Sequence, residues 1–132
     1  MVSKSQISGL TLDTGALLAL DHPRKSGAMH AILKSAWHRE GSLCIPAGAV
    51  AQAWRGPQQV RLARLIKSPE VDIAIMTLKV ARSVGALCAA SGHHNVIDVH
   101  VALCARERGH AVVTSDLDDI ARVDPSLVII RV

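Results

Sequence analysis

Five short apolar segments recur along the chain, and a stretch with helical character separates each one from the next. These segments are residues 7–13, 42–45, 71–76, 110–114 and 126–132. Their hydrophobicity is continuous rather than alternating, which is typical of strands buried on both faces of a parallel sheet. Regular alternation of strand and helix predicts an α/β fold, a three-layer sandwich with a mostly parallel central sheet of four to five strands.

Helix signals fill the stretches between the apolar segments. The expected helices are residues 14–21, 26–41, 46–54, 58–68, 77–91, 96–109 and 115–123. Pro46 is expected to open the third of them and Thr77 to cap the fifth. Apolar residues recur at helical spacing in residues 26–41, and Gly41 ends that helix. They are Met29, Ile32, Leu33, Ala36 and Trp37, the last assigned to core or dimer packing.

The composition predicts one domain with an aliphatic core. The chain has 132 residues, of which 49% are hydrophobic and 20% charged, and it contains neither Phe nor Tyr. No low-complexity or Pro/Ser-rich linker interrupts it, which argues against disorder. Because this length suits one domain and is too short for two, we expect a single domain over residues 1–132.

Neither a membrane segment nor a disulfide framework is expected. The apolar runs fall short of the about 20 residues that a membrane helix needs. Asp13 interrupts the N-terminal stretch that would otherwise read as a signal peptide. Cys44, Cys88 and Cys104 lie far apart among apolar neighbours, so buried, reduced thiols are predicted rather than disulfides or a zinc site. These features predict a cytoplasmic protein without membrane contact.

Basic residues concentrate in the middle of the chain. The formal charge is +4, and no acidic residue occurs between Glu40 and Glu70. Such a segment attracts phosphates or an acidic partner, although taken alone it is better explained as an ordinary solvated helix face. The basic residues of this segment are Arg55, Arg61, Arg64 and Lys67.

Acidic residues follow two of the predicted strands. Asp13 comes directly after the first strand and Asp116 after the fourth, while Asp98 lies near the start of a helix. In a parallel sheet such positions open onto the same edge, so these side chains are expected to meet. Three converging carboxylates repel one another unless a cation neutralises them, and oxygen ligands suit Mg²⁺ or Mn²⁺.

Helix capping is the competing explanation for each of these aspartates. Asp is a favoured N-cap, so any one of them alone is better explained as a cap than as a ligand. The local excess favours a site, because Asp116, Asp118 and Asp119 exceed what one short helix needs.

The histidines suggest another kind of site, but their spacing does not support it. His93 and His94 are adjacent and His100 follows, without the HxxxH or HExxH spacing of a metal site. We therefore expect His93 and His94 in a surface turn and His100 at most at the rim of the cleft. Phosphate-binding loops, dinucleotide fingerprints and nucleophile elbows do not occur in the sequence.

Four motifs, taken in their order along the chain, resemble those of PIN-domain nucleases. They are LTLDTGALLAL at residues 10–20, IPAGAVAQAWRG at 45–56, VIDVHVALCARERG at 96–109 and AVVTSDLDDIARV at 111–123. The chain is most similar to the VapC-type toxins of bacterial toxin–antitoxin modules. The resemblance covers nearly the whole chain, and the pairing of the first motif with the last is its most specific part.

This resemblance implies a Mg²⁺- or Mn²⁺-dependent endoribonuclease with a PIN-like fold. It also implies RNA as substrate, a VapB-like antitoxin that occupies the cleft, and a homodimer. Carried over by motif, Asp13, Asp98 and Asp116 are the catalytic metal ligands and Asp119 is an accessory one. Thr114 is expected to brace the site by hydrogen bonding. Arg55, Arg61, Arg64 and Lys67 would hold the flanking phosphates of the RNA.

One position departs from the family pattern. The family places a Glu on the helix that begins after the second strand, and the matching residue here is Gln52. One negative charge is thereby lost, which predicts weaker metal binding or a site completed only with RNA bound. A catalytically weakened PIN-like module that binds RNA or a protein is therefore the alternative. A receiver-type signalling domain ranks last, because residues 71–77 end without Asp and no Lys follows residues 112–116.

Overall fold

The computed structural model describes residues 7–132, so residues 1–6 of the signal-like N-terminal stretch lie outside the described part. Five strands form one sheet in the order β3-β2-β1-β4-β5, and every neighbouring pair is parallel. The strands are β1 (Gly9–Leu12), β2 (Ser42–Pro46), β3 (Val71–Ala74), β4 (Ala111–Thr114) and β5 (Ile129–Arg131). The predicted α/β fold with a parallel central sheet is confirmed.

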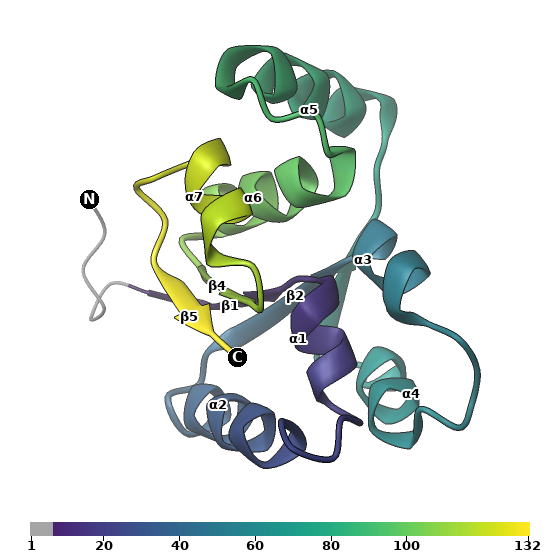
Figure 1. Ribbon diagram of the computed structural model, residues 1–132. Coiled ribbons are helices and arrows are strands. Elements are labelled where there is room, and N and C mark those ends of the chain that lie inside the picture. The colour runs from purple at the N-terminus through teal and green to yellow at the C-terminus, as the bar shows by residue number, and fades with distance from the viewer. Residues whose placement is uncertain (1–6) are drawn as a thin grey trace.

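Helices cover both faces of this sheet. The helices are α1 (Thr14–Ala19), α2 (Ser26–His38), α3 (Ala47–Ala53), α4 (Val60–Lys67), α5 (Leu78–Ser91), α6 (Val96–Arg108) and α7 (Leu117–Val123). In Figure 1, α5, α6 and α7 lie above the sheet, and α2 and α4 lie below it. None of the helices within residues 7–132 is long and apolar enough to span a membrane.

The core consists of aliphatic side chains on the two sides of the sheet. On one side, Leu12, Ile45 and Leu62 are fully buried in a cluster that also includes residues of α1 and α2. On the other side, α6 presents buried residues to the sheet and to both neighbouring helices. Small residues such as Ala102 and Ala105 let α6 pack closely there. Residues 99–105 of α6 are all buried, which explains why the sequence of this helix lacks a strong amphipathic pattern.

Two strands are shorter than the apolar segments predict, for local reasons. Ala74, the last residue of β3, pairs with Pro46, which has no N–H with which to extend the ladder. Ile75 and Met76 therefore lie outside the strand and are exposed. Before β5, the Asp124 side chain accepts hydrogen bonds from the backbone N–H and the hydroxyl of Ser126, so a turn takes the first residues of the predicted segment.

The structure narrows one prediction about packing and corrects another. Trp37 is 43% exposed and lines a groove between α2 and α4, so it is not a core residue, and its dimer contact stays a prediction. Cys44, Cys88 and Cys104 are free thiols, but only Cys44 and Cys104 are buried, because Cys88 lies half-buried on α5. The apolar face of α4 carries Leu62 and Leu65, and both are buried in the core.

The order of the strands places one crevice at the centre of the sheet. After β1 the chain proceeds outward through β2 to β3, and it then returns to place β4 on the other side of β1. Ligands of open parallel sheets bind where the order reverses in this way, outside the carboxyl ends of the strands. Here that point lies between β1 and β4, from which the loops bearing Asp13 and Asp116 emerge.

Candidate metal centre

Asp13 occupies the junction of β1 and α1. Its carboxylate accepts a hydrogen bond from the backbone N–H of Ala16 at 3.0 Å, and the side chain caps α1. The residue is only 6% exposed. Burial raises the pKa of this carboxyl, and the charge of Asp98 adds to the increase, while a hydrogen bond from Thr114 opposes it. Asp13 is thus a cap and also a buried acid whose charge a cation would stabilise.

Asp98 lies in the first turn of α6 but does not cap it. The Asn95 side chain is the cap, because it accepts hydrogen bonds from the backbone N–H groups of Ile97 and Asp98 at 3.1 Å each. The Asp98 carboxylate is therefore free of a capping role. One of its oxygens, Oδ2, lies 3.0 Å from Nε2 of His93, and the two side chains are partly buried.

Asp116 and Asp119 share the start of α7. Asp116 caps this helix by accepting a hydrogen bond from the Asp119 backbone N–H at 3.2 Å. The Asp116 N–H in turn donates to the Thr114 hydroxyl at 2.8 Å. A side-chain hydrogen bond with Asp116 raises the pKa of the Asp119 carboxyl, with further increases from burial and from the nearby charges of Asp116 and Asp98. Asp118 is exposed.

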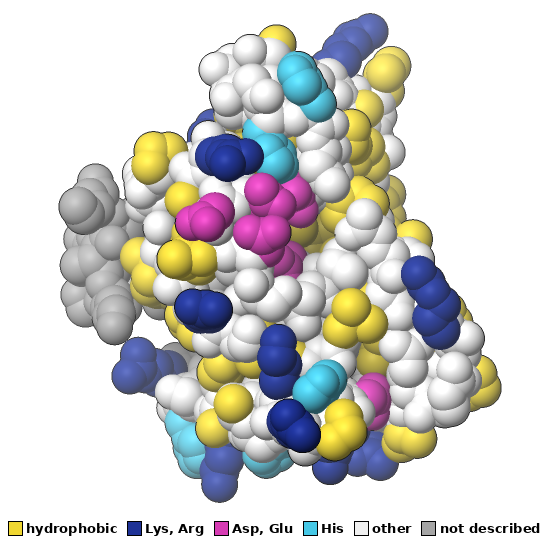
Figure 2. All heavy atoms as spheres, viewed as in Figure 1, with side chains coloured by type: hydrophobic (Ala, Val, Ile, Leu, Met, Phe, Trp, Pro, Cys, Tyr) yellow, Lys and Arg dark blue, Asp and Glu magenta, His cyan; other side chains and the backbone are white. Residues whose placement is uncertain are grey.

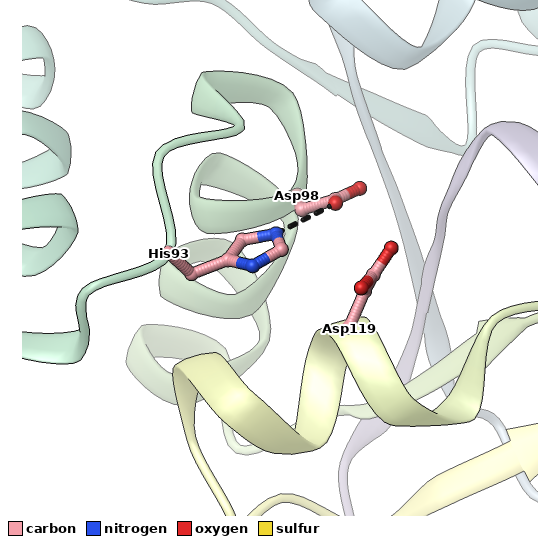
Figure 3. Close-up of side chains that lie close together, drawn as sticks. All are labelled: His93, Asp98 and Asp119. Atoms are coloured by element: carbon pink, nitrogen blue, oxygen red, sulfur yellow. Dashed lines mark hydrogen bonds and ion pairs between the residues drawn. The ribbon is translucent and has the colours of Figure 1, made fainter.

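These elements bring the acidic side chains to one patch on the surface. Figure 2 shows carboxylates gathered there with a histidine against them. Donor atoms of His93, Asp98 and Asp119 lie within 4.8 Å of one another, and Figure 3 shows the three side chains pointing toward a common point. Asp13 is near enough to Asp98 for the charge of Asp98 to raise its pKa. Carboxylates beside one imidazole form a donor set that fits a divalent cation.

Thr114 connects the two sides of this patch. It is fully buried at the end of β4, next to β1 in the sheet. Its hydroxyl accepts a hydrogen bond from the Asp116 backbone N–H at 2.8 Å, and its interaction with the Asp13 carboxyl opposes the rise in the pKa of that group. One side chain therefore lies beside two of the predicted ligands.

Gln52 lies beside the patch, on α3. Its Oε1 accepts a hydrogen bond from the Thr14 hydroxyl at 2.6 Å, and Thr14 directly follows Asp13. The side chain is exposed and brings an amide where the PIN-domain pattern has a carboxylate. Its carbonyl oxygen is engaged with α1, so this wall of the site carries no negative charge.

The predicted RNA-binding residues lie apart from the carboxylates. Figure 1 shows α4, which carries three of them, on the opposite side of the sheet from α6 and α7. Arg55 donates to the backbone carbonyl of Trp54 at 2.7 Å, and Arg61 donates to that of Leu20 at 3.4 Å. Arg64 and Lys67 are exposed, and their side chains form no hydrogen bond or ion pair with any residue in the range 7–132.

The histidines differ from the sequence prediction. His93 was expected in a surface turn, but its ring is partly buried against Asp98. His100 was expected at most at the cleft rim, but it is 2% exposed and packs beside Cys104. The cause is the sharp turn before α6, which folds His93 back over the first turn of that helix.

No protein-family pattern matches the sequence, and no curated protein matches it. Solved structures do match in fold. FitAB bound to the IR36 DNA fragment superposes with a TM-score of 0.65 at 17% identity, covering 92% of this chain and 94% of the other. VapC20 of Mycobacterium tuberculosis, a sarcin–ricin loop cleaving toxin, gives 0.65 at 16% identity, with 94% and 100% covered. FitAcB from Neisseria gonorrhoeae gives 0.62 at 18% identity, with 91% and 95% covered. At these identities the likeness establishes the fold, which is PIN-like as expected.

Proposed function

We propose that this chain is a Mg²⁺- or Mn²⁺-dependent endoribonuclease and the toxin of a toxin–antitoxin pair. The observation that carries the proposal is that donor atoms of His93, Asp98 and Asp119 lie within 4.8 Å of one another, at the sheet edge where β1 and β4 lead into Asp13 and Asp116. The proposed enzyme is a single cytoplasmic domain over residues 1–132 that forms a homodimer. Support for RNA as the substrate comes from the fold neighbour described as a sarcin–ricin loop cleaving toxin. A VapB-like antitoxin is the proposed partner.

The residues of the patch divide the catalytic work between them. Asp13, Asp98 and Asp116 would hold the cation with Asp119 as an accessory ligand, and Thr114, which accepts a hydrogen bond from the Asp116 backbone, would keep Asp116 in position. When bound, such a cation supplies charge neutralisation at the phosphate and acidifies a water for attack on phosphorus. Because Asp13 is buried, its side chain has little freedom to move. Its carboxylate would therefore keep one orientation toward the cation and the scissile phosphate.

Cleavage of mixed RNAs by the purified chain, free of any partner, tests the proposal. We expect cleavage with Mg²⁺ or Mn²⁺ and none with chelator. Asp13→Asn and Asp98→Asn should each lower the rate by about 100-fold or more, because each removes a metal ligand. Asp118→Asn is the matched control, since Asp118 is exposed on the same helix as Asp119 and should leave the rate unchanged. Failure to cleave RNA with either metal would contradict the enzyme assignment.

Gln52 supports the second candidate, a PIN-like module that binds RNA or a protein without cleaving. Its amide replaces the expected carboxylate and hydrogen bonds Thr14, so the side of the site formed by α3 carries no charge. Under the enzyme assignment, Gln52→Glu should tighten Mg²⁺ binding, because a carboxylate is a stronger ligand for a hard cation than an amide. Calorimetric titration of both proteins measures this change. If the natural chain binds RNA without cutting it, and only the Glu variant cleaves, the binding module is the correct function.

A further inference from the structure

His93 contributes a nitrogen donor to a site that is otherwise made of carboxylates. Its Nε2 lies 3.0 Å from an oxygen of Asp98, and its side chain is only 13% exposed. Donor atoms of His93, Asp98 and Asp119 all lie within 4.8 Å of one another. Figure 3 shows the imidazole entering from the turn before α6, while Asp98 and Asp119 come from α6 and α7.

The spacing of these three atoms suits one shared ion. Ligand atoms that each lie about 2.1 Å from a cation are at most about 4.2 Å apart. The three donor atoms here lie within 4.8 Å of one another, slightly more than that limit. Small side-chain rotations would bring them within range of one ion. Asp119 is well placed to rotate, because its carboxylate lies on a partly exposed helix start.

The backbone holds His93 in this position from both sides. Gly92 ends α5 in the left-handed region, with φ of 73°. The backbone N–H of His93 donates to the Ser91 hydroxyl at 3.2 Å. Two residues on, Asn95 caps α6 with two hydrogen bonds. The turn is thus tied to the helix on each side of it, and its next residue, His94, is exposed to solvent.

We propose that His93 is a nitrogen ligand of the metal at this site and gives it a preference for Mn²⁺ over Mg²⁺. The proposal rests on the proposed function, in which the patch holds a divalent cation. Mg²⁺ takes oxygen ligands and keeps its water shell, whereas imidazole binds transition metals well. Gln52 acts in the same direction, because loss of a carboxylate weakens the site most for a cation that depends on charged oxygens.

A purely structural role for His93 predicts a different result. If His93 only hydrogen bonds Asp98, it competes with the cation for that carboxylate. Its removal would then free the carboxylate and strengthen the binding of both metals. Under our proposal, removal weakens the binding of Mn²⁺ and leaves that of Mg²⁺ nearly unchanged.

Metal binding to the full chain, measured without RNA, separates these roles. Calorimetry gives the affinities for Mn²⁺ and Mg²⁺, and electron spin-echo modulation of bound Mn²⁺ reports a directly coordinated ¹⁴N. We expect the wild-type chain to show the nitrogen coupling. His93→Ala should lose it, with a drop in Mn²⁺ affinity of about tenfold or more. His94→Ala is the matched control and should keep both the coupling and the affinity, because His94 is the exposed neighbour.

The proposal is overturned if wild-type protein binds no Mn²⁺, or binds it without nitrogen coupling. It is also overturned if His93→Ala binds both metals more tightly, or if His94→Ala loses the coupling. The wild-type spectrum alone can overturn the proposal, so it stays testable even if His93→Ala does not fold. Nitrogen coupling without RNA cleavage would count against the proposed function and leave the ligand assignment standing. RNA cleavage without nitrogen coupling would overturn the assignment of His93 as a ligand and leave the proposed function standing.

Discussion

Asp13 links the stability of the fold to its candidate chemistry. Its pKa is raised above the usual value of 3.8, chiefly by burial and further by the charge of Asp98. A raised carboxyl pKa means that the folded chain holds the proton more tightly than the unfolded chain does. The free energy of unfolding therefore falls as pH rises from 3.8 through the raised pKa, and the loss persists at neutral pH. The ionised carboxylate destabilises the metal-free protein.

Asp13→Asn should for this reason stabilise the metal-free protein at pH 7. Asn removes the buried charge and still caps α1, because Asn and Asp are about equally good N-caps. Urea unfolding in chelator should show a higher midpoint for the variant at pH 7, and the difference should shrink toward pH 4. Adding Mn²⁺ should stabilise the wild-type chain more than the variant. A variant that is less stable at pH 7 would show that burial does not penalise the charge of Asp13.

The sequence could predict that Asp13 and Asp116 lie at one edge of the sheet, because the carboxyl ends of parallel strands share that edge. It could not predict that His93 lies against Asp98, because that contact depends on a turn folded back over α6. The capping role of Asn95 could not be predicted from the sequence either. A sequence offers several polar residues near a helix start, and only the structure shows that Asn95 takes the capping role and leaves Asp98 free.

At the scale of elements, close contact between α1 and the β4–α7 loop fixes the spacing of two predicted ligands. Gly15 lies in the first turn of α1, and a Cβ there would overlap the Ser115 hydroxyl and lie 2.8 Å from the Ser115 Cβ. Asp13 and Asp116 each lie within two residues of this contact. Glycine therefore sets how closely the two loops approach.

Gly15→Ala should separate these loops and impair the site. Overpacking costs about 1–3 kcal/mol, against at most about 1 kcal/mol gained from the helix propensity of Ala. We expect a lower unfolding midpoint and a lower cleavage rate. The double variant Gly15→Ala with Ser115→Gly should recover most of both, because it removes the clashing Cβ and Oγ. If Ser115→Gly does not rescue the first substitution, the contact does not set the geometry.

Helices and strands were largely predictable, because burial on a regular scaffold leaves a periodic sequence pattern. Prediction was wrong where a local interaction overrides that pattern. The third apolar segment outlasts β3 because Pro46 cannot extend the ladder. Trp37 follows the helical stripe of α2 but lies at its margin, where α2 and α4 form a groove, so only the core half of its predicted role, core or dimer packing, is wrong.

At the scale of the whole molecule, the two edges of the sheet are chemically different. The amino edge carries a buried polar group that is satisfied within the protein, since His110 hydrogen bonds Thr11 at 3.1 Å and Ser42 at 2.8 Å. The carboxyl edge between β1 and β4 carries acids whose charges are only partly balanced. The parallel order of the strands thus brings the perturbed carboxylates to one edge.

The molecule also separates its charges. It is basic as a whole, with a formal charge of +4, although a cluster of carboxylates lies at the candidate site. RNA bound at an acidic site needs cations elsewhere to hold its flanking phosphates. Arg64 and Lys67 on α4 suit that role better than Arg55 or Arg61, whose side chains donate to backbone carbonyls.

Salt dependence of RNA binding tests this division of charge. In the Asp13→Asn chain, which should bind RNA without cleaving it, affinity should fall as salt rises. Replacing Arg64 and Lys67 by Ala should weaken binding and reduce the slope of log affinity against log salt by about 1.4, the value for two contacts to single-stranded phosphates. Lys34 on α2 and Arg39, the residue that follows the end of α2, are both exposed and provide a matched pair with the same charge change. If both pairs change the slope equally, RNA binding depends only on the net charge of the protein, and α4 is not the RNA-binding surface.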